Sequence, residues 1–194
     1  VIAGVYSNTQ TLDWAPVGSG VTNDVKTALQ GGAADNLACT PLPAGSLAGK
    51  VALIDRGACS VSLKVDFAAK AGAVGVLIGL VAPGDAVSFS YGGGDTFVPS
   101  LVIQQSLSSA IKARLAAGDV VNVSISNASA ISLEGSMASS SSRGPAYSTQ
   151  HIKPEIGAPG ASVSAEAGTG SGQTAFGGTS GAAPMVAGAA ALLI

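Results

Sequence analysis

One serine near the end of the chain stands in a setting that suits nucleophilic chemistry. Ser180 follows Gly178 and Thr179 in "GGTSGAAP", at the point where an apolar helical pattern begins. The glycine allows a sharp turn and a close approach of the backbone to a substrate. At a helix N-terminus, unpaired backbone N–H groups and the positive end of the dipole favour a developing negative charge. The segment thus offers a hydroxyl and oxyanion donors, two of the parts that acyl transfer requires.

The same spacing also fits a purely structural role for this serine. Serine is a preferred helix N-cap, so from spacing alone a cap is the simpler interpretation of Ser180. The Gly-X-Ser-X-Gly elbow of the α/β-hydrolases does not fit, because residue 182 is alanine and no strand is expected before the motif. The small residues that follow suit a helix packed closely against other backbone. We therefore expect a central, buried helix.

The two cysteines, Cys39 and Cys59, enclose a loop of about 20 residues. Two thiols and a single distant histidine do not provide four ligands at a familiar spacing, and carboxylates are not clustered, so no metal site is expected. A disulfide would stabilise the fold by about 3 kcal/mol in an oxidising compartment. Two buried free thiols are the alternative.

Composition indicates a densely buried fold. Hydrophobic residues make up 47% of the 194 residues and charged residues 10%. The net charge is −2 and the basic residues are scattered, so nucleic acid is not an expected partner. The longest apolar runs, 71–82 and 184–194, are shorter than the roughly 20 residues that cross a bilayer, so no membrane partner is expected. No cofactor is expected, and the opening at Val1 has no signal-peptide pattern, which indicates a mature or trimmed product.

The middle of the chain alternates between strand and helix patterns. An apolar run at 50–55, bounded by glycines, predicts a buried strand. A helix is predicted over 60–71, with Ser60 as N-cap and Gly72 after its end. A near-continuous apolar strand over 73–80 completes a β-α-β unit.

A second unit of the same kind is predicted further along. It contains a strand over 98–104 and a helix with Ser106 as its cap and Gly118 as its stop. The strand over 119–126 has apolar residues with period two, as a half-buried strand should. The block from about 21 to 130 is therefore interpreted as one small α/β domain.

Three stretches, in order, resemble the subtilisin-like serine proteases. The segment "GTSGAAPMVAGAAALL" (178–193) resembles their nucleophile segment. It is preceded by "MASSSSRGP" (137–145) and "KPEIGAPG" (153–160), which resemble two further stretches of that family. The resemblance implies that Ser180 is the nucleophile and that its own backbone N–H helps to form the oxyanion hole.

The turn before the serine keeps the family pattern, while later positions depart from it. By resemblance, Gly178 and Thr179 support the nucleophile turn. Gly181 and Met185 stand where the family often has methionine and histidine. These departures alter packing near the site but leave the Gly-Thr-Ser core intact.

The block "CTPLPAGSLAGKVALIDRGACSVSLKVDFAAKAGAVGVLIG" (39–79) resembles the protease-associated (PA) domain. This is a small α/β insertion found in many secreted subtilisin-like proteases and in some receptors. The expected fold class is α/β, with a PA-type open barrel or sandwich of β-α-β units. The expected domains are a connecting segment from the catalytic domain (1–20), the PA domain (21–130) and the C-terminal segment of the catalytic domain with the nucleophile helix (131–194).

The partners of a catalytic triad are not found in this sequence. His151 is the single histidine, and it lies in "STQHIKPEIG" rather than in the family's His-Gly-Thr-His setting, so we expect a solvated loop residue. Asp95 comes nearest to Asp-Ser/Thr-Gly but is followed by Thr-Phe, and Asn8 lacks the glycine-containing context of the oxyanion asparagine. We expect histidine and aspartate to come from upstream of Val1, and the fragment alone to be inactive.

The resulting interpretation is part of a secreted serine endopeptidase. It would hydrolyse peptide bonds through an acyl-enzyme on Ser180, with the PA domain modulating substrate or protein access. The expected partners are a polypeptide substrate and the missing N-terminal catalytic segment. The alternative is a non-catalytic protein-binding PA module with a remnant tail. In the "IDRG" turn, Asp55 and Arg56 are more simply explained by a salt bridge or loop hydrogen bond than by a substrate contact.

Overall fold

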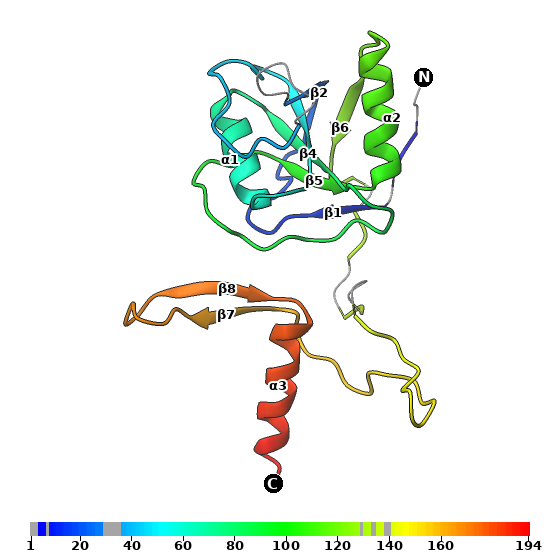
Figure 1. Cartoon of the computed structure of the whole chain (residues 1–194), viewed down its shortest axis with the longest axis vertical. Coiled ribbons are helices and arrows are strands. Elements are labelled where there is room, and N and C mark those ends of the chain that lie inside the picture. Colours follow the sequence, from blue (N-terminus) through cyan, green and yellow to red (C-terminus); the bar gives the residue numbers. More distant parts are fainter. Residues whose placement is uncertain (1–3, 7, 29–35, 129, 133–134, 138–140) are drawn as a thin grey trace. The chain divides into compact units, whose positions relative to one another are not determined.

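Figure 1 shows the computed structural model of the chain. The structure describes all residues except 1–3, 7, 29–35, 129, 133–134 and 138–140. The side chains of 161–164 and 174–177 are also not described. The chain forms two compact units, Val1–Ile131 and Ser132–Ile194, which are described separately below.

The first unit is built on a curled six-stranded sheet with the strand order β1-β5-β4-β3-β2-β6. Strands β2 to β5 are mutually parallel, and the two outer strands, β1 and β6, run antiparallel to their neighbours. The strands are β1 (Thr9–Thr11), β2 (Val21–Thr27), β3 (Val51–Asp55), β4 (Gly75–Gly79), β5 (Ser100–Ile103) and β6 (Asn122–Ile125), and the helices are α1 (Val61–Lys70) and α2 (Gln105–Ala116). This mixed arrangement confirms the expected α/β fold class.

The central strands β3 and β4 are buried on both faces. Alternate side chains of a strand point to opposite faces of the sheet. Along β3, Ala52 and Ile54 belong to the core that includes α1, whereas Val51 and Leu53 belong to the core that includes α2. One helix therefore covers each face of the sheet (Figure 1). Because side chains on both faces are buried, the sequences of these strands are continuously apolar.

The first predicted β-α-β unit is confirmed. Strands β3 and β4 are parallel neighbours, and α1 connects them. Ser60 occupies the N-cap position, but its hydroxyl makes no capping bond and instead lies 3.0 Å from the Ser62 hydroxyl. Gly72 follows the helix with a φ of 95°, a left-handed conformation that glycine adopts without strain.

The second predicted unit is wrong in its topology and in its helix cap. Strand β5 and helix α2 form as expected, but the helix begins at Gln105 with Gln104 as N-cap, so Ser106 is not the cap. Strand β6 does not lie beside β5 and pairs antiparallel with β2 at the other edge of the sheet. Its alternating exposure, with Ile125 buried, suits an edge strand with one covered face.

Strands β1 and β2 were not expected. The sequence of β2, "VTNDVKT", is largely polar, and Val25 is its one buried residue. Strand β1 is short and lies at the edge of the sheet, and β2 is mostly polar although it pairs with β3 and β6, so neither has the apolar run that marks a buried strand.

A long segment without helix or strand, residues 80–99, connects β4 to β5. The indole Nε1 of Trp14 donates to the Phe89 carbonyl oxygen at 2.8 Å, and the Trp14 and Phe97 rings lie 5.2 Å apart in an edge-to-face arrangement. The carboxylate of Asp66 on α1 is buried and accepts hydrogen bonds from the backbone N–H groups of Asp95 and Thr96 at 3.0 and 2.9 Å. The connection is therefore fastened to the domain near its middle and near its second end.

The disulfide between Cys39 and Cys59 is present, with a Cα–Cα distance of 5.7 Å, which confirms that prediction. It joins the segment before β3 to the turn that connects β3 with α1. The expected alternative of two free thiols is therefore excluded.

The second unit contains an antiparallel hairpin and one helix. Strands β7 (Ala161–Ala165) and β8 (Gln173–Gly177) pair, and α3 (Thr179–Ala191) begins after a single intervening residue, Gly178. Among the helix residues that the structure describes, Gly181 is the one that is buried, so the expected burial of this helix is not provided within its own unit. Across the described residues, no helix combines the length and apolar character needed to span a membrane.

Lys70 generates a testable electrostatic prediction. Its ammonium lies 3.0 Å from the Asp66 carboxylate and 2.8 Å from that of Asp95. The hydrogen bond from Lys70, aided by Thr96 and Asp66, lowers the pKa of Asp95 from 3.8 to about 2. Because the pKa is lower in the folded state, this contribution to stability is complete above the unfolded value of about 4 and is lost as the pH falls towards 2.

We expect Lys70→Met to raise the pKa of Asp95 towards 3.8, as measured by NMR titration of the carboxyl carbons. Lys26→Met is the matched control, because the Lys26 ammonium bonds to the Ser46 carbonyl oxygen instead, and it should leave Asp95 unchanged. An unchanged pKa of Asp95 in Lys70→Met would show that the other hydrogen bonds alone hold it low.

Candidate nucleophile site

Ser180 is presented by a tight strand-to-helix turn. Strand β8 ends at Gly177, Gly178 adopts φ 79° and ψ −169°, and the helix begins at Thr179. This combination of angles is essentially restricted to glycine. The carbonyl oxygen of Gly178 accepts hydrogen bonds from the N–H groups of Gly181 and Ala182 at 3.0 and 3.2 Å, as the N-cap residue of a helix does.

Two expectations about this turn are therefore wrong. A strand does precede the motif, although the glycine- and serine-rich approach to it predicted none. Gly178, not Ser180, is the N-cap, and Ser180 is the second residue of the helix. The residue before Thr179 must adopt angles that suit glycine. Gly178 therefore takes the N-cap position, and the helix has already begun when it reaches Ser180.

The position of Ser180 leaves both its hydroxyl and nearby donors accessible. Ser180 is exposed. In the part of the chain that the structure describes, the backbone N–H groups of Thr179 and Ser180 have no hydrogen-bond acceptor. They lie at the positive end of a 13-residue helix. An oxyanion next to Ser180 could accept hydrogen bonds from such donors.

A backbone contact joins two of the stretches that sequence analysis singled out. The N–H group of Gly178 donates to the carbonyl oxygen of Gly160 at 2.6 Å. Gly160 ends the "KPEIGAPG" stretch and directly precedes β7, whose first residue pairs with Gly177. The sequence gives no signal for this contact, since it depends on a hairpin that was not expected.

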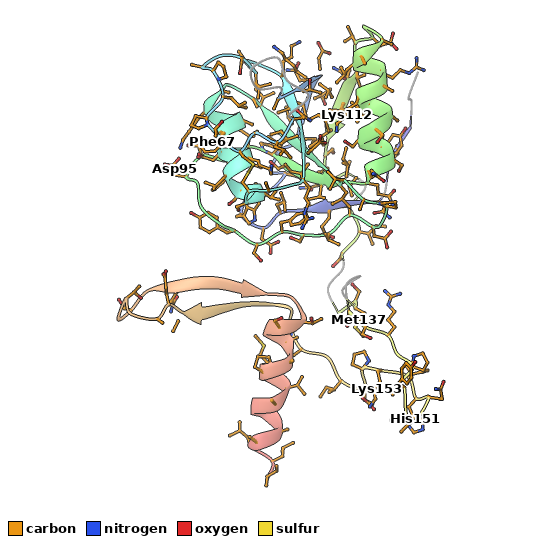
Figure 2. The ribbon with its side chains drawn as sticks, in the orientation of Figure 1. Phe67, Asp95, Lys112, Met137, His151 and Lys153 are labelled. Atoms are coloured by element: carbon orange, nitrogen blue, oxygen red, sulfur yellow. A yellow bond between two sulfur atoms is a disulfide. The ribbon has the colours of Figure 1, made fainter. Side chains whose placement is uncertain are left out.

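The "SRGP" and "HIKP" stretches also lie together in one loop, in which His151 and Lys153 are labelled in Figure 2. The N–H group of Ala146 donates to the carbonyl oxygen of His151 at 2.9 Å. Gly144 has a φ of 74°, and a Cβ atom there would lie 2.9 Å from the backbone nitrogen of Lys153. The side chain of His151 is exposed in this loop, as expected.

The other candidates from the sequence lie in the first unit and make structural contacts. The amide of Asn8 donates to Asp85 at 2.7 Å and accepts from the N–H of Ala86 at 2.9 Å. Asp95 pairs with Lys70. These side chains fix the segment between β4 and β5 and do not form a catalytic group with each other.

The "IDRG" turn contains a salt bridge, as expected. Asp55, at the end of β3, forms an ion pair with Lys112 of α2. The guanidinium of Arg56 lies over the Phe89 ring, 5.7 Å from its centroid. A hollow of about 200 Å³ beside it is lined by Arg56, Phe89 and four aliphatic side chains. Within the described residues, no three side chains of His, Cys, Asp and Glu are grouped so that they could hold a metal ion.

Comparisons with known proteins match both units. Residues 19–111 match the PA domain family, and residues 121–194 match the subtilase family. The chain is 32% identical over 155 residues to the minor extracellular protease Vpr of Bacillus subtilis (strain 168). That match covers 76% of this chain and 18% of the relative, so the chain spans less than a fifth of the relative's length.

Solved structures of peptidases show partial likeness. An aminopeptidase from Aneurinibacillus sp. strain AM-1 is 30% identical, with a TM-score of 0.47 over 61% of this chain and 27% of that one. A peptidase M28 precursor from Shewanella amazonensis SB2B is 23% identical, with a TM-score of 0.44 over 60% of this chain and 30% of that one. The PA domain match, the subtilase match and the 32% identical relative together show that this chain is similar to subtilisin-like proteases that carry a PA domain.

Proposed function

We propose that the chain is part of a secreted serine endopeptidase that hydrolyses peptide bonds of a polypeptide substrate through an acyl-enzyme on Ser180. The observation that carries this proposal is the exposed Ser180 in the first turn of α3, beside unbonded backbone N–H groups. Its hydroxyl oxygen attacks the substrate carbonyl, and a general base takes the proton. The N–H of Ser180 and the helix dipole stabilise the oxyanion.

The base and the carboxylate that orients it come from outside this chain. The second unit contains no aspartate in its sequence, and its one histidine, His151, lies exposed in a loop. A triad requires a histidine hydrogen-bonded to the serine and a carboxylate behind that histidine. We infer that an N-terminal catalytic segment of the same protease supplies both, and that this segment is a required partner.

The surface of α3 supports the same inference. Leu192, Leu193 and Ile194, which directly follow α3, are 88–109% exposed, and Met185 within α3 is 39% exposed. So many apolar side chains on one short element indicate a surface that another part of the protein covers. We propose that the catalytic segment, which would also supply the base and the carboxylate, packs on these apolar side chains.

The PA unit is proposed to modulate access of substrate or of other proteins. In this proposal residues 1–20 connect it to the catalytic domain and also contribute β1 to its sheet, residues 21–130 are the PA domain and residues 131–194 are the C-terminal catalytic segment. Secretion is supported by the disulfide, which persists in oxidising compartments, and by the extracellular relative. No role for a cofactor, nucleic acid or membrane is proposed.

One observation favours an alternative function, a non-catalytic protein-binding PA module with a remnant tail. The first unit has a buried core on both faces of its sheet, whereas α3 in the second unit has one buried residue. A folded PA domain could therefore act without the tail. The two functions differ in whether Ser180 reacts once the missing catalytic segment is present.

The first test labels Ser180 with a fluorophosphonate. The isolated chain should react no faster than its own Ser180→Ala variant, because nothing activates the hydroxyl. Addition of the N-terminal catalytic segment, or use of the full-length protease, should give stoichiometric labelling. Efficient labelling of Ser180 in the isolated chain would contradict the proposal that the base and carboxylate come from elsewhere.

A second test measures peptide hydrolysis by the full-length protease. Ser180→Ala should lower kcat by about 10⁶-fold, since members of a triad act as one unit. Ser148→Ala, an exposed serine in the "SRGP" loop, is the matched control and should retain activity. If the full-length protein shows no peptidase activity but binds protein ligands equally well with and without Ser180, the alternative function holds.

A third test concerns the turn that presents the nucleophile. Gly178→Ala should cost about 1–3 kcal/mol of stability, because alanine is strained at these angles. The resulting shift of Ser180 should lower kcat/KM of the full-length protease by about 100-fold. In the isolated chain, Gly188→Ala lies within the same helix with open space around it and should instead stabilise by about 0.5–1 kcal/mol. Urea unfolding and steady-state kinetics measure both effects, and equal behaviour of the two variants would refute the proposed role of the turn.

A further inference from the structure

A buried lysine in the PA unit has no part in the proposed hydrolysis. Lys64, on α1, is 0% exposed. Its ammonium donates a hydrogen bond to the carbonyl oxygen of Leu37 and lies 3.5 Å from the Sγ atom of Cys39. A buried cation beside one sulfur makes the two ends of the Cys39–Cys59 disulfide chemically unequal.

We propose that this disulfide is a thiol-exchange site. The thiolate of a small thiol attacks Sγ of Cys59, a new S–S bond forms there, and the Cys39–Cys59 bond breaks. The electron pair of the broken bond leaves with Cys39 as a thiolate beside the Lys64 ammonium. No other oxidant or reductant takes part, because the external thiolate supplies the electron pair.

The identity of the leaving sulfur follows from the charges on each side. A thiol with a lower pKa leaves faster, and an adjacent ammonium lowers a thiol pKa. Cys59 also has a favourable neighbour, because it directly precedes Ser60, the N-cap of α1. That helix end carries only about half an elementary charge, spread over the first turn. The full charge of Lys64 in direct contact with Cys39 therefore decides the direction.

The surroundings of Cys59 suit the approach of an anionic thiolate. Cys59 is partly exposed, in the turn between β3 and α1. Arg56 lies in the same turn, is exposed, and pairs with no carboxylate among the described residues. Its guanidinium attracts a negatively charged thiol such as glutathione.

The segment before Cys39 has main-chain contacts of its own besides the disulfide. Asn36 is buried, and neither polar atom of its side-chain amide has a hydrogen-bond partner in the part of the chain that the structure describes. Its carbonyl oxygen accepts from the N–H of Asp55 at 2.9 Å. The unpaired amide costs local stability, while the hydrogen bonds from Asp55 to Asn36 and from Lys64 to Leu37 hold the segment in place without the disulfide.

The experiment treats the full chain with glutathione, quenches with acid and caps free thiols with N-ethylmaleimide. Trypsin cleaves after Lys50 and Arg56, which places the two cysteines on different peptides for mass spectrometry. In molecules with one glutathione, we expect it on Cys59 and the maleimide on Cys39. Glutathione mainly on Cys39, or equally on both, would overturn the proposal.

Three variants test the role of the lysine. Lys64→Met should slow exchange by about three- to tenfold, because the leaving thiolate loses its neighbouring positive charge, and should remove the preference for Cys59. Lys64→Arg keeps a charge and should retain most of the preference. Lys26→Met removes an exposed lysine of the same unit and should change nothing. An unchanged rate in Lys64→Met would overturn the proposal.

Circular dichroism would show whether Lys64→Met folds. If it does not, a measurement on the unmodified chain tests the same proposal. The chain is reduced and pulsed with iodoacetamide over a range of pH, and alkylation of each cysteine is followed by mass spectrometry. Cys39 should reach half-maximal reactivity at a lower pH than Cys59. The opposite order would refute the assignment of Cys39 as the leaving thiol.

Discussion

Burial of both faces of β3 and β4 is the constraint on which the PA unit depends. Because alternate side chains enter different cores, α1 and α2 must lie on opposite sides of the sheet. The parallel direction of the two strands then places their carboxyl ends at one edge. The salt bridge of Asp55 and the turn that carries Arg56 and Cys59 lie at that edge.

Among the side chains that the structure describes, those of the second unit form no core comparable to that of the first. It consists of a two-stranded hairpin and a helix whose apolar side chains are largely exposed. An isolated hairpin is at best marginally stable in water. Backbone conformation and main-chain hydrogen bonds therefore set the geometry of the turn before Ser180.

The sequence predicted those parts of the structure that have a strong local pattern. The apolar runs of β3 and β4, the helices with glycine after their ends, and the disulfide are all found. The partner of β6 was not predictable, because edge pairing depends on strand order and not on periodicity. The hairpin before Ser180 was hidden by glycine and serine, residues that are also typical of linkers. Hence the nucleophile candidate could be named, but the N-cap at Gly178 and the contact with Gly160 could not.

The hydrogen bond between Gly178 and Gly160 has a consequence for how this site can vary. Both partners are main-chain atoms, so the link between the two motif stretches does not require a particular side chain on either. Substitutions at neighbouring helix positions, such as Gly181 and Met185, can therefore change the packing around α3 while the attachment of the turn is preserved. The turn before Ser180 can therefore keep its attachment while the side chains around it change.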